Sequence, residues 1–216
     1  MPQKVEYFDI SPVLSAGSAV FPGDTAFTRT PSEIFGSGSY LQVSKIESTV
    51  HIGAHADAPI HYHAEGQTID ERPVDLYFGK CQVISVKLGR GERIRPEHVR
   101  VKIEAPRVLF KTRSFPNPDR WNGDFNSLSP ELIQDLASQG VKLVGIDTPS
   151  VDPADSKALE SHQAIFKNDL AVLEGIVLEK VADGVYGLMA LPLNIRDGDA
   201  APVRAVLVRG NRLWND

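Results

Sequence analysis

The sequence predicts an α/β fold, in which a mixed, largely antiparallel β-sheet forms a barrel-like core with a few flanking helices. Three observations support this prediction. The chain has 216 residues, a length that fits one sizeable domain over residues 1–216. Short apolar runs bounded by Gly and Pro recur along the chain, as is typical of strands. A helix pattern at 129–140 is followed at once by a buried-strand pattern at 141–147, an order typical of α/β proteins.

The first half of the chain predicts strands and a long loop. Four short runs rich in β-branched and aromatic residues predict strands: 4–10, 40–50, 81–88 and 107–112. Apolar and polar residues alternate within 81–88, so we expect one face of this strand to be more polar. Residues 11–27 are rich in Gly, Pro and Ser and predict a surface loop. This loop carries Phe21, whose ring we expect to be exposed.

A second long loop, 115–129, contains two prolines and the aromatic residues Phe115, Trp121 and Phe125. Loops of this length are uncommon without a role. Two interpretations stay open: a lid or interface arm, and a plain surface excursion.

The second half of the chain begins with a well-marked helix at 129–140. Ser129 is its N-cap, Pro130 lies in its first turn and Gly140 ends it. The remaining patterns complete the fold: strands at 141–147, 184–193 and 202–210, and a helix at about 156–168.

The charge balance argues against nucleic acid and membranes as partners. Lys and Arg number 23 against 28 Asp and Glu, a net charge of −5, and no basic cluster stands out. No apolar run approaches the roughly 20 residues of a membrane span, and the N-terminus lacks the apolar core of a signal peptide. We therefore expect a cytoplasmic protein. The single cysteine, Cys81, forbids an internal disulfide and is expected to be buried.

The densest cluster of metal-ligand residue types is HIGAHADAPIH at 51–61. Imidazole nitrogens and carboxylate oxygens are ligands that zinc and similar ions favour, and this stretch supplies His51, His55, Asp57 and His61. Its Gly and Pro residues disfavour a helix, so we expect a loop leaving the preceding strand. With one Cys in the chain, a hydrolytic metal site is favoured over a structural zinc site. The alternative is that these are ordinary hydrogen-bonded residues.

Two residues far downstream would complete a dinuclear site. Glu174 lies in the apolar stretch 171–181, where an ionised carboxylate is costly unless it is paired or bound to a cation. His162 lies on or beside the apolar face of the predicted helix. Taken alone, each is better explained as a satisfied polar residue. Two ions held close together need bridging carboxylates, and the sequence offers Asp57 and Glu174 for that role, with His51, His55 and His162 as terminal ligands.

The motif HIGAHADAPIH resembles the HxGxHxDxPxH signature of the cyclase-like metal hydrolases, and the chain is most similar to the bacterial-type kynurenine formamidases (arylformamidases). The resemblance runs nearly from end to end, through FDISPVL at 8–14, FPGDT at 21–25, GAHADAPIHY at 53–62, LVGIDTPSVDP at 143–153, the segment 162–174, LMALPL at 188–193 and PVRAVL at 202–207.

The resemblance implies two divalent metal ions in each subunit and a homodimer or larger homo-oligomer. His51, His55 and Asp57 would hold one ion. Asp57, His162 and Glu174 would hold the other, with Glu174 also reaching the first. Zinc is the default ion for these ligands, and manganese also fits.

The resemblance also implies hydrolysis of N-formyl-L-kynurenine to L-kynurenine and formate, in tryptophan degradation by the kynurenine pathway. A metal-bridging hydroxide would attack the formyl carbon, and His61, left off the metals, would act as general acid/base. Phe21 lies where family members commonly carry a substrate-contacting tryptophan, so it would stack on an aromatic formamide. For the carboxylate of the substrate, three residues stay open: Arg72, Arg113 and Arg120.

Two rival functions are retained. A related hydrolase of the same family, acting on a cyclic imide or lactam such as isatin, would fit the change at Phe21. A metal-dependent binding protein without turnover is the other, and an intact His61 argues against it.

Overall fold

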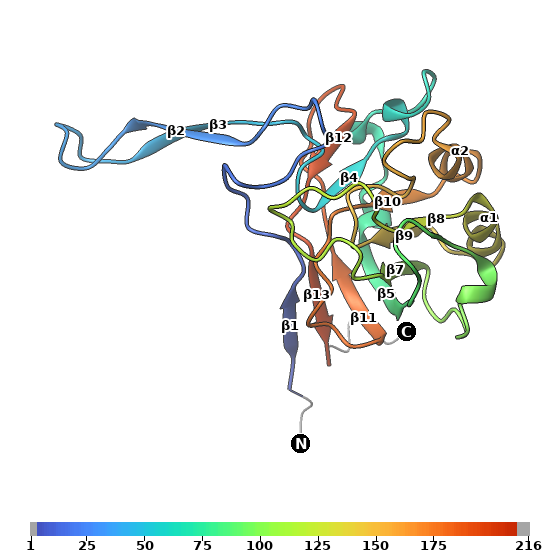
Figure 1. The fold of residues 1–216 in the computed structure, drawn as a ribbon. Helices are drawn as coiled ribbons and strands as arrows, with labels where there is room; N and C mark the ends of the chain where they lie inside the picture. The colour runs from blue at the N-terminus through green and yellow to red at the C-terminus, as the bar shows by residue number, and fades with distance from the viewer. Residues whose placement is uncertain (1–3, 211–216) are drawn as a thin grey trace.

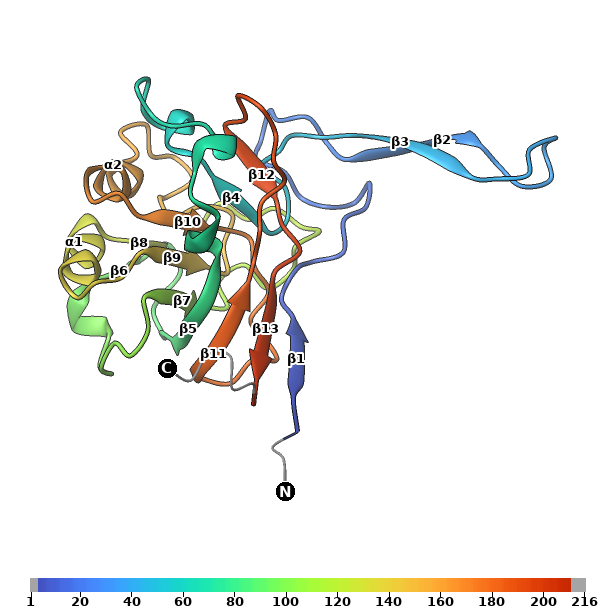
Figure 2. The ribbon, with the colours of Figure 1, turned by 180° about the vertical axis from the view of Figure 1, so that it is seen from behind.

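The computed structural model describes residues 4–210 and is built on a seven-stranded mixed sheet (Figures 1 and 2). From edge to edge, its strands are β1 (Glu6–Asp9), β13 (Val206–Arg209), β11 (Gly184–Met189), β5 (Phe78–Ser85), β7 (Arg107–Lys111), β9 (Leu143–Ile146) and β10 (Ala171–Leu173). Neighbours pair antiparallel from β1 to β5 and parallel from β5 to β10. The predicted α/β fold with a mixed sheet is confirmed. The barrel-like core and the single domain over 1–216 stay predictions.

An apolar layer covers each face of the sheet. On one face lie helices α1 (Pro130–Ser138) and α2 (Glu160–Lys167), whose buried residues join one core cluster. Val83 of β5 packs in the cluster on the opposite face, while its neighbour Ile84 packs with the helices. The predicted polar face of 81–88 is confirmed at its carboxyl end, where Ser85 and Lys87 are exposed while Ile84 and Val86 are buried. The same face is apolar at Val83, because β5 is an interior strand with a packed layer on each side.

Both predicted helices are present. α1 follows Ser129, whose Oγ accepts a hydrogen bond from Leu132 N at 3.2 Å. α2 is shorter than predicted and begins at Glu160, because Leu159 takes a left-handed φ of 47°. Among residues 4–210, the structure contains no helix long and apolar enough to cross a membrane.

Short elements surround the central sheet. β4 (His55–Asp57) pairs antiparallel with β12 (Ala200–Pro202), so the loop predicted at 51–61 is wrong at its centre. The small side chains of Ala56 and Ala201 are fully buried where the two strands pair. The other short elements are β6 (Arg93–Ile94) with β8 (Ser127–Leu128), and the 3-10 turns η1 (Pro59–His61), η2 (Ile69–Glu71), η3 (Val74–Tyr77) and η4 (Pro96–His98).

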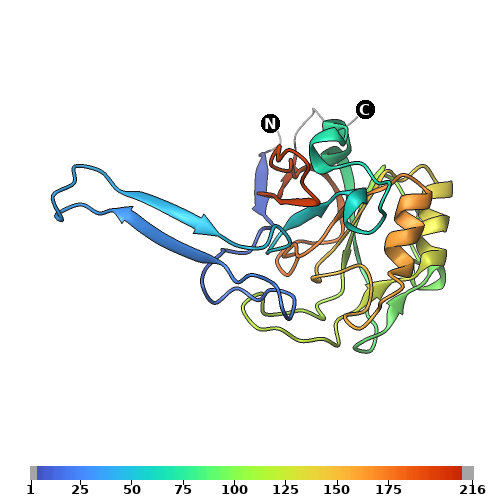
Figure 3. The same ribbon diagram turned by 90° about the horizontal axis from the view of Figure 1, so that it is seen from above.

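An antiparallel hairpin, which we call the arm, projects from the body (Figures 1 and 3). It consists of β2 (Thr28–Glu33) and β3 (Val43–Glu47) with the turn between them. β3 lies in the strand predicted at 40–50, whereas β2, with the sequence TRTPSE, offered no apolar alternation to predict it. Large apolar side chains are exposed along the arm: Ile34, Phe35, Tyr40, Val43 and Ile46.

Candidate metal centre

A cavity of about 480 Å³ lies where the chain leaves the carboxyl ends of β7, β9 and β10. Ligands commonly bind at this edge of open α/β sheets. Six of the seven site residues predicted from the sequence line the cavity: Phe21, His51, His55, His61, His162 and Glu174. The seventh, Asp57, lies among them and is only 2% exposed.

The backbone brings His55 and Glu174 together. Their main chains form an isolated antiparallel bridge, with His55 N donating to Glu174 O at 3.1 Å and Glu174 N donating to His55 O at 2.9 Å. Gly53 and Gly175 flank this bridge with φ values of 56° and 64°, and a Cβ on Gly175 would lie 2.0 Å from Gly53 O. Glycine at these positions permits the close approach that sets the two side chains next to each other.

Two buried carboxylates lie between three imidazoles. Asp57 Oδ1 lies 2.9 Å from His51 Nδ1 and 3.3 Å from His55 Nε2, and Asp57 Oδ2 lies 3.4 Å from His162 Nε2. Glu174 Oε2 lies 3.4 Å from His55 Nε2, and Glu174 Oε1 lies 3.5 Å from His162 Nε2. Each carboxylate thus turns one oxygen toward His55 and the other toward His162. Carboxylate oxygens and imidazole nitrogens grouped in this way suit metal coordination.

The other ring nitrogen of each imidazole is tied to an oxygen of the protein. Three hydrogen bonds do this: His55 Nδ1 donates to Gly53 O at 3.0 Å, His162 Nδ1 donates to Asp152 Oδ2 at 2.9 Å, and His51 Nε2 donates to Asp199 Oδ2 at 2.9 Å. Such contacts fix the tautomer and the ring orientation of metal-binding histidines. In each ring the remaining nitrogen is left as a lone-pair donor facing the carboxylates.

Two atoms at the centre are buried without a hydrogen bond. Among the described residues, neither His55 Nε2 nor Asp57 Oδ1 has a hydrogen-bond partner. Leaving a buried polar atom unpaired costs roughly 1–3 kcal/mol. A metal ion held by these residues would remove that cost.

The electrostatics also favour a cation. Burial by itself lowers the pKa of His55, but the carboxylates of Asp57 and Glu174 outweigh burial and raise this pKa to about 10. Burial raises the pKa of Asp57, yet the surrounding imidazoles, His162 foremost, hold it well below its usual range. The centre therefore stabilises positive charge next to ionised carboxylates. Divalent cations bound by neutral imidazoles supply that charge, so the residues present fit a metal site.

His61 lies at the edge of the centre. Its ring centroid is 4.0 Å from that of His51, and its Nδ1 lies 3.9 Å from Asp199 Oδ2. The side chain is 34% exposed, and partial burial lowers its pKa, which favours the neutral imidazole. A ring nitrogen of His61 also falls within 4.8 Å of ligand atoms of His51 and Asp57. The geometry thus permits both proton transfer and an additional contact to a bound ion.

Aromatic side chains form another part of the cavity lining. Phe21 lines it and is 38% exposed, with its ring centroid 5.0 Å from that of Trp121. The loop predicted at 115–129 lines the cavity through Phe115, Pro118 and Trp121, so it is not a plain surface excursion.

Three residues of this site were not assigned a role from the sequence: Trp121, Asp152 and Asp199. The sequence offered a clue to two of them: Trp121 lies in a loop rich in aromatic residues, and Asp152 lies in the TPSVDP block that resembles the family. Asp199 follows the Asp197-Gly198 pair and carried no such clue, because its contact with His51 joins positions 148 residues apart.

The three arginines considered for the carboxylate of the substrate lie elsewhere. Arg72 is buried against Asp169, with Nη1 2.7 Å from Oδ1, and Arg113 pairs with Glu179 at 3.2 Å. Arg120 is exposed and does not line the cavity. Among the described residues that line it, the cavity has no Lys or Arg at all.

Comparisons with known proteins agree on the family. The profile described as putative cyclase matches residues 8–153. A kynurenine formamidase from Delftia acidovorans (strain DSM 14801 / SPH-1) is 46% identical over 202 residues, which cover 93% of this chain and 96% of that protein. A solved structure of a potential metal-dependent hydrolase with cyclase activity has a TM-score of 0.81 and 25% identity, covering 95% of this chain and 98% of that chain. Isatin hydrolase A from Labrenzia aggregata, bound to benzyl benzoate, shares the fold with a TM-score of 0.78 and 21% identity over 96% of this chain and 94% of its own. With this coverage and identity, the chain belongs to the cyclase family and, within it, to the kynurenine formamidases.

Proposed function

We propose that this protein is an arylformamidase that hydrolyses N-formyl-L-kynurenine to L-kynurenine and formate, a step of tryptophan degradation. The observation that carries the proposal is the pair of buried carboxylates between three imidazoles, in a cavity that aromatic side chains also line. A formamide is a poor electrophile, so its hydrolysis near neutral pH needs strong electrostatic help at the reacting carbonyl. The kynurenine formamidase relative supports the choice of substrate.

We assign two divalent metal ions to the centre, zinc by ligand type and manganese as the alternative. His51 and His55 would hold one ion, and His162 the other, with Asp57 and Glu174 shared between them. Bound there, the ions supply the acidity that makes water a nucleophile near neutral pH and the positive charge that stabilises the developing oxyanion. Asp152 and Asp199 fix the rings of His162 and His51 in the orientation this requires.

We assign proton transfer to His61. Its lowered pKa keeps the imidazole neutral near pH 7, ready to accept a proton from the attacking water. The same ring then donates that proton to the nitrogen of the leaving arylamine as the C–N bond breaks. Partial exposure of His61 at the cavity lets it face both the water and the leaving group.

We further propose that the protein is a homodimer or a larger homo-oligomer. Phe35 and Tyr40 are 65% and 89% exposed on the arm. An isolated two-stranded hairpin is at best marginally stable in water. A second copy that covers the arm would remove these apolar side chains from water.

The test is the rate of N-formyl-L-kynurenine hydrolysis, followed by absorbance, for the metal-loaded protein before and after chelation. We expect turnover that the chelator abolishes and that added zinc or manganese restores, with two ions per chain by metal analysis. Turnover of isatin without turnover of the formamide would instead favour the rival cyclic-imide hydrolase. Tight metal binding with no turnover of any amide would favour a binding protein.

A further inference from the structure

Two loops far apart in the sequence form a joint wall of the cavity. Ala19 N, in the loop after β1, donates a hydrogen bond to Pro118 O at 2.9 Å. Beside it, Ser18 Oγ lies 3.5 Å from Asp119 Oδ1. Figure 3 shows the blue loop that follows β1 running next to the yellow-green loop that follows β7. Both loops contribute aromatic rings to the cavity: Phe21 from the first, Phe115 and Trp121 from the second.

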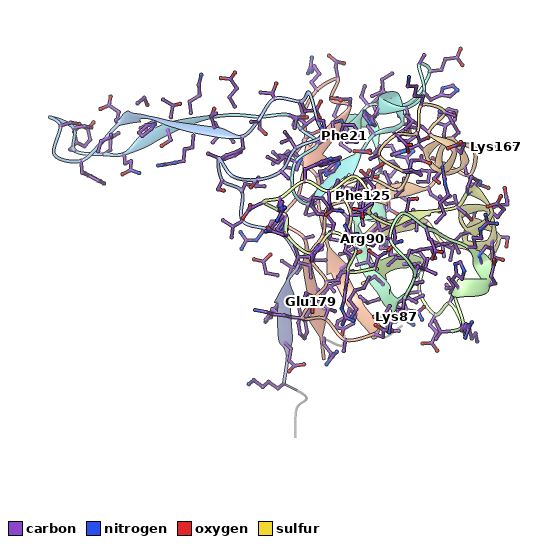
Figure 4. The ribbon with its side chains drawn as sticks, viewed as in Figure 1. Phe21, Lys87, Arg90, Phe125, Lys167 and Glu179 are labelled. Carbon is purple, nitrogen blue, oxygen red and sulfur yellow. The ribbon has the colours of Figure 1, made fainter. Side chains whose placement is uncertain are left out.

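Trp121 is the centre of an aromatic cluster in this wall. Its ring centroid lies 5.0 Å from that of Phe21, 6.1 Å from Phe115 and 5.9 Å from Phe125, with interplanar angles of 69°, 70° and 86°. These are the edge-on arrangements that aromatic pairs prefer. Phe125 is 1% exposed and anchors the cluster in the body, whereas Phe21 lies at the exposed end (both labelled in Figure 4).

The loop that carries Trp121 is pinned at its base. Arg90 pairs with both carboxylate oxygens of Asp124 at 2.5 Å, and Asn126 Nδ2 donates to Glu92 O at 3.0 Å. Asn126 N donates to Ser114 Oγ at 2.8 Å, which closes the loop. A ring held in this way is ordered before a ligand arrives, so stacking on it costs little conformational entropy.

We infer that Trp121 is a specificity-determining residue that binds the aromatic ring of the substrate, an inference that rests on the proposed function. Trp121 lines the same cavity as the metal centre and packs edge-on against Phe21. Its indole is the largest of the three aromatic rings that Phe21, Phe115 and Trp121 contribute to this wall. Because no described Lys or Arg lines the cavity, binding of an N-formylated aromatic amine depends on its ring rather than on a carboxylate.

The experiment uses the fact that the sequence has two tryptophans, at positions 121 and 214. In Trp214→Phe, the fluorescence of Trp121 alone reports on the cavity. We expect the product L-kynurenine to quench this emission along a saturable curve. The Kd from that curve should agree with the Kd from calorimetry. This measurement leaves Trp121 in place and does not depend on turnover.

Two substitutions then separate binding from packing. Trp121→Leu should raise KM for N-formyl-L-kynurenine and Kd for L-kynurenine by about tenfold, with kcat within about threefold of wild type. Trp121→Phe keeps a ring in the cluster and should restore most of the affinity. Unchanged metal content and circular dichroism in both variants would show that the centre is intact.

The outcomes distinguish this inference from the proposed function. The role of Trp121 alone would be overturned by three results together. The wild type would turn over the substrate, saturating L-kynurenine would leave the Trp121 emission unchanged, and the KM of Trp121→Leu would lie within about twofold of wild type. A wild type that neither hydrolyses N-formyl-L-kynurenine nor binds L-kynurenine would overturn both.

Discussion

Asp57 shares its two carboxylate oxygens between imidazoles from different parts of the chain, with Oδ1 near His51 and His55 and Oδ2 near His162. Three ring nitrogens within 3.4 Å make it the residue on which the proposed centre most depends. Asp57 is buried, so these imidazoles rather than solvent water surround its carboxylate.

We therefore expect Asp57→Ala to lose bound metal and to lower the rate of hydrolysis by more than about a hundredfold, since even outer contacts to metal ligands contribute 10- to 100-fold. Metal analysis after dialysis, together with the rate, checks this. Asp124→Ala removes an exposed carboxylate paired with Arg90 and should leave the metal content unchanged. Full metal occupancy in Asp57→Ala would contradict the bridging role.

His61→Ala should show the opposite pattern, with metal content kept and turnover lowered by about 10²- to 10⁴-fold, the usual contribution of a general acid/base. His63→Ala is the matched control, because His63 stacks on Phe166 at a centroid distance of 3.8 Å and does not line the cavity. Loss of metal in His61→Ala would make His61 a ligand, and normal turnover would remove it from the chemistry.

Asp152 offers a test of how His162 is oriented. Its Oδ2 accepts hydrogen bonds from His162 Nδ1 at 2.9 Å and from the backbone N of the same residue at 3.0 Å. Asp152→Asn keeps the shape but weakens the acceptor, so we expect metal affinity to fall by about 10- to 100-fold. Competition with a chromophoric chelator measures this change. An unchanged affinity would mean that His162 needs no such support.

At the scale of elements, the sequence was most informative where local chemistry decides the structure. The cap at Ser129 and the Gly140 stop define α1, and the apolar run after them defines β9. Elements whose pairing partner lies far away were not predictable. β4 is a strand only because β12, at Ala200–Pro202, pairs with it.

The arm is the element whose role is simplest to test. Replacing residues 30–45 by a two-residue Asn-Gly turn removes four of its five exposed apolar side chains, all but Ile46, and we expect the oligomer to dissociate. Light scattering during gel filtration measures the mass. Tyr7→Ser, at a 70% exposed tyrosine outside the arm, should leave the assembly unchanged. A wild-type monomer, or an unchanged mass without the arm, would overturn the proposed assembly.

For the molecule as a whole, the centre links segments that are distant along the chain. The loop before β4, the end of β10 and the start of α2 meet at His51, Glu174 and His162. A metal that binds only this folded arrangement stabilises it by about 4 kcal/mol at roughly a thousand times its Kd. In a chain of this size that corresponds to about 10 °C in Tm.

We therefore expect chelation to lower Tm by about 10 °C and zinc to restore it. Scanning calorimetry or dye-based melting measures the shift. Asp57→Ala should melt at the same temperature with and without zinc, which controls for metal bound elsewhere. Equal melting temperatures of the metal-free and metal-loaded wild type would mean that the ions do not couple to folding.

The residue types of the centre and the main helices and strands could be predicted from the amino-acid sequence. Ligand-type residues crowd into 51–61, and capping and periodicity act over a few neighbouring residues, so both can be read from the chain. Three features became visible only in the folded molecule: His162 meets Asp57 across 105 positions, β5 has an apolar layer on both faces, and the loops of Phe21 and Trp121 form one wall. These contacts depend on strand order and packing, which spacing along the sequence does not encode.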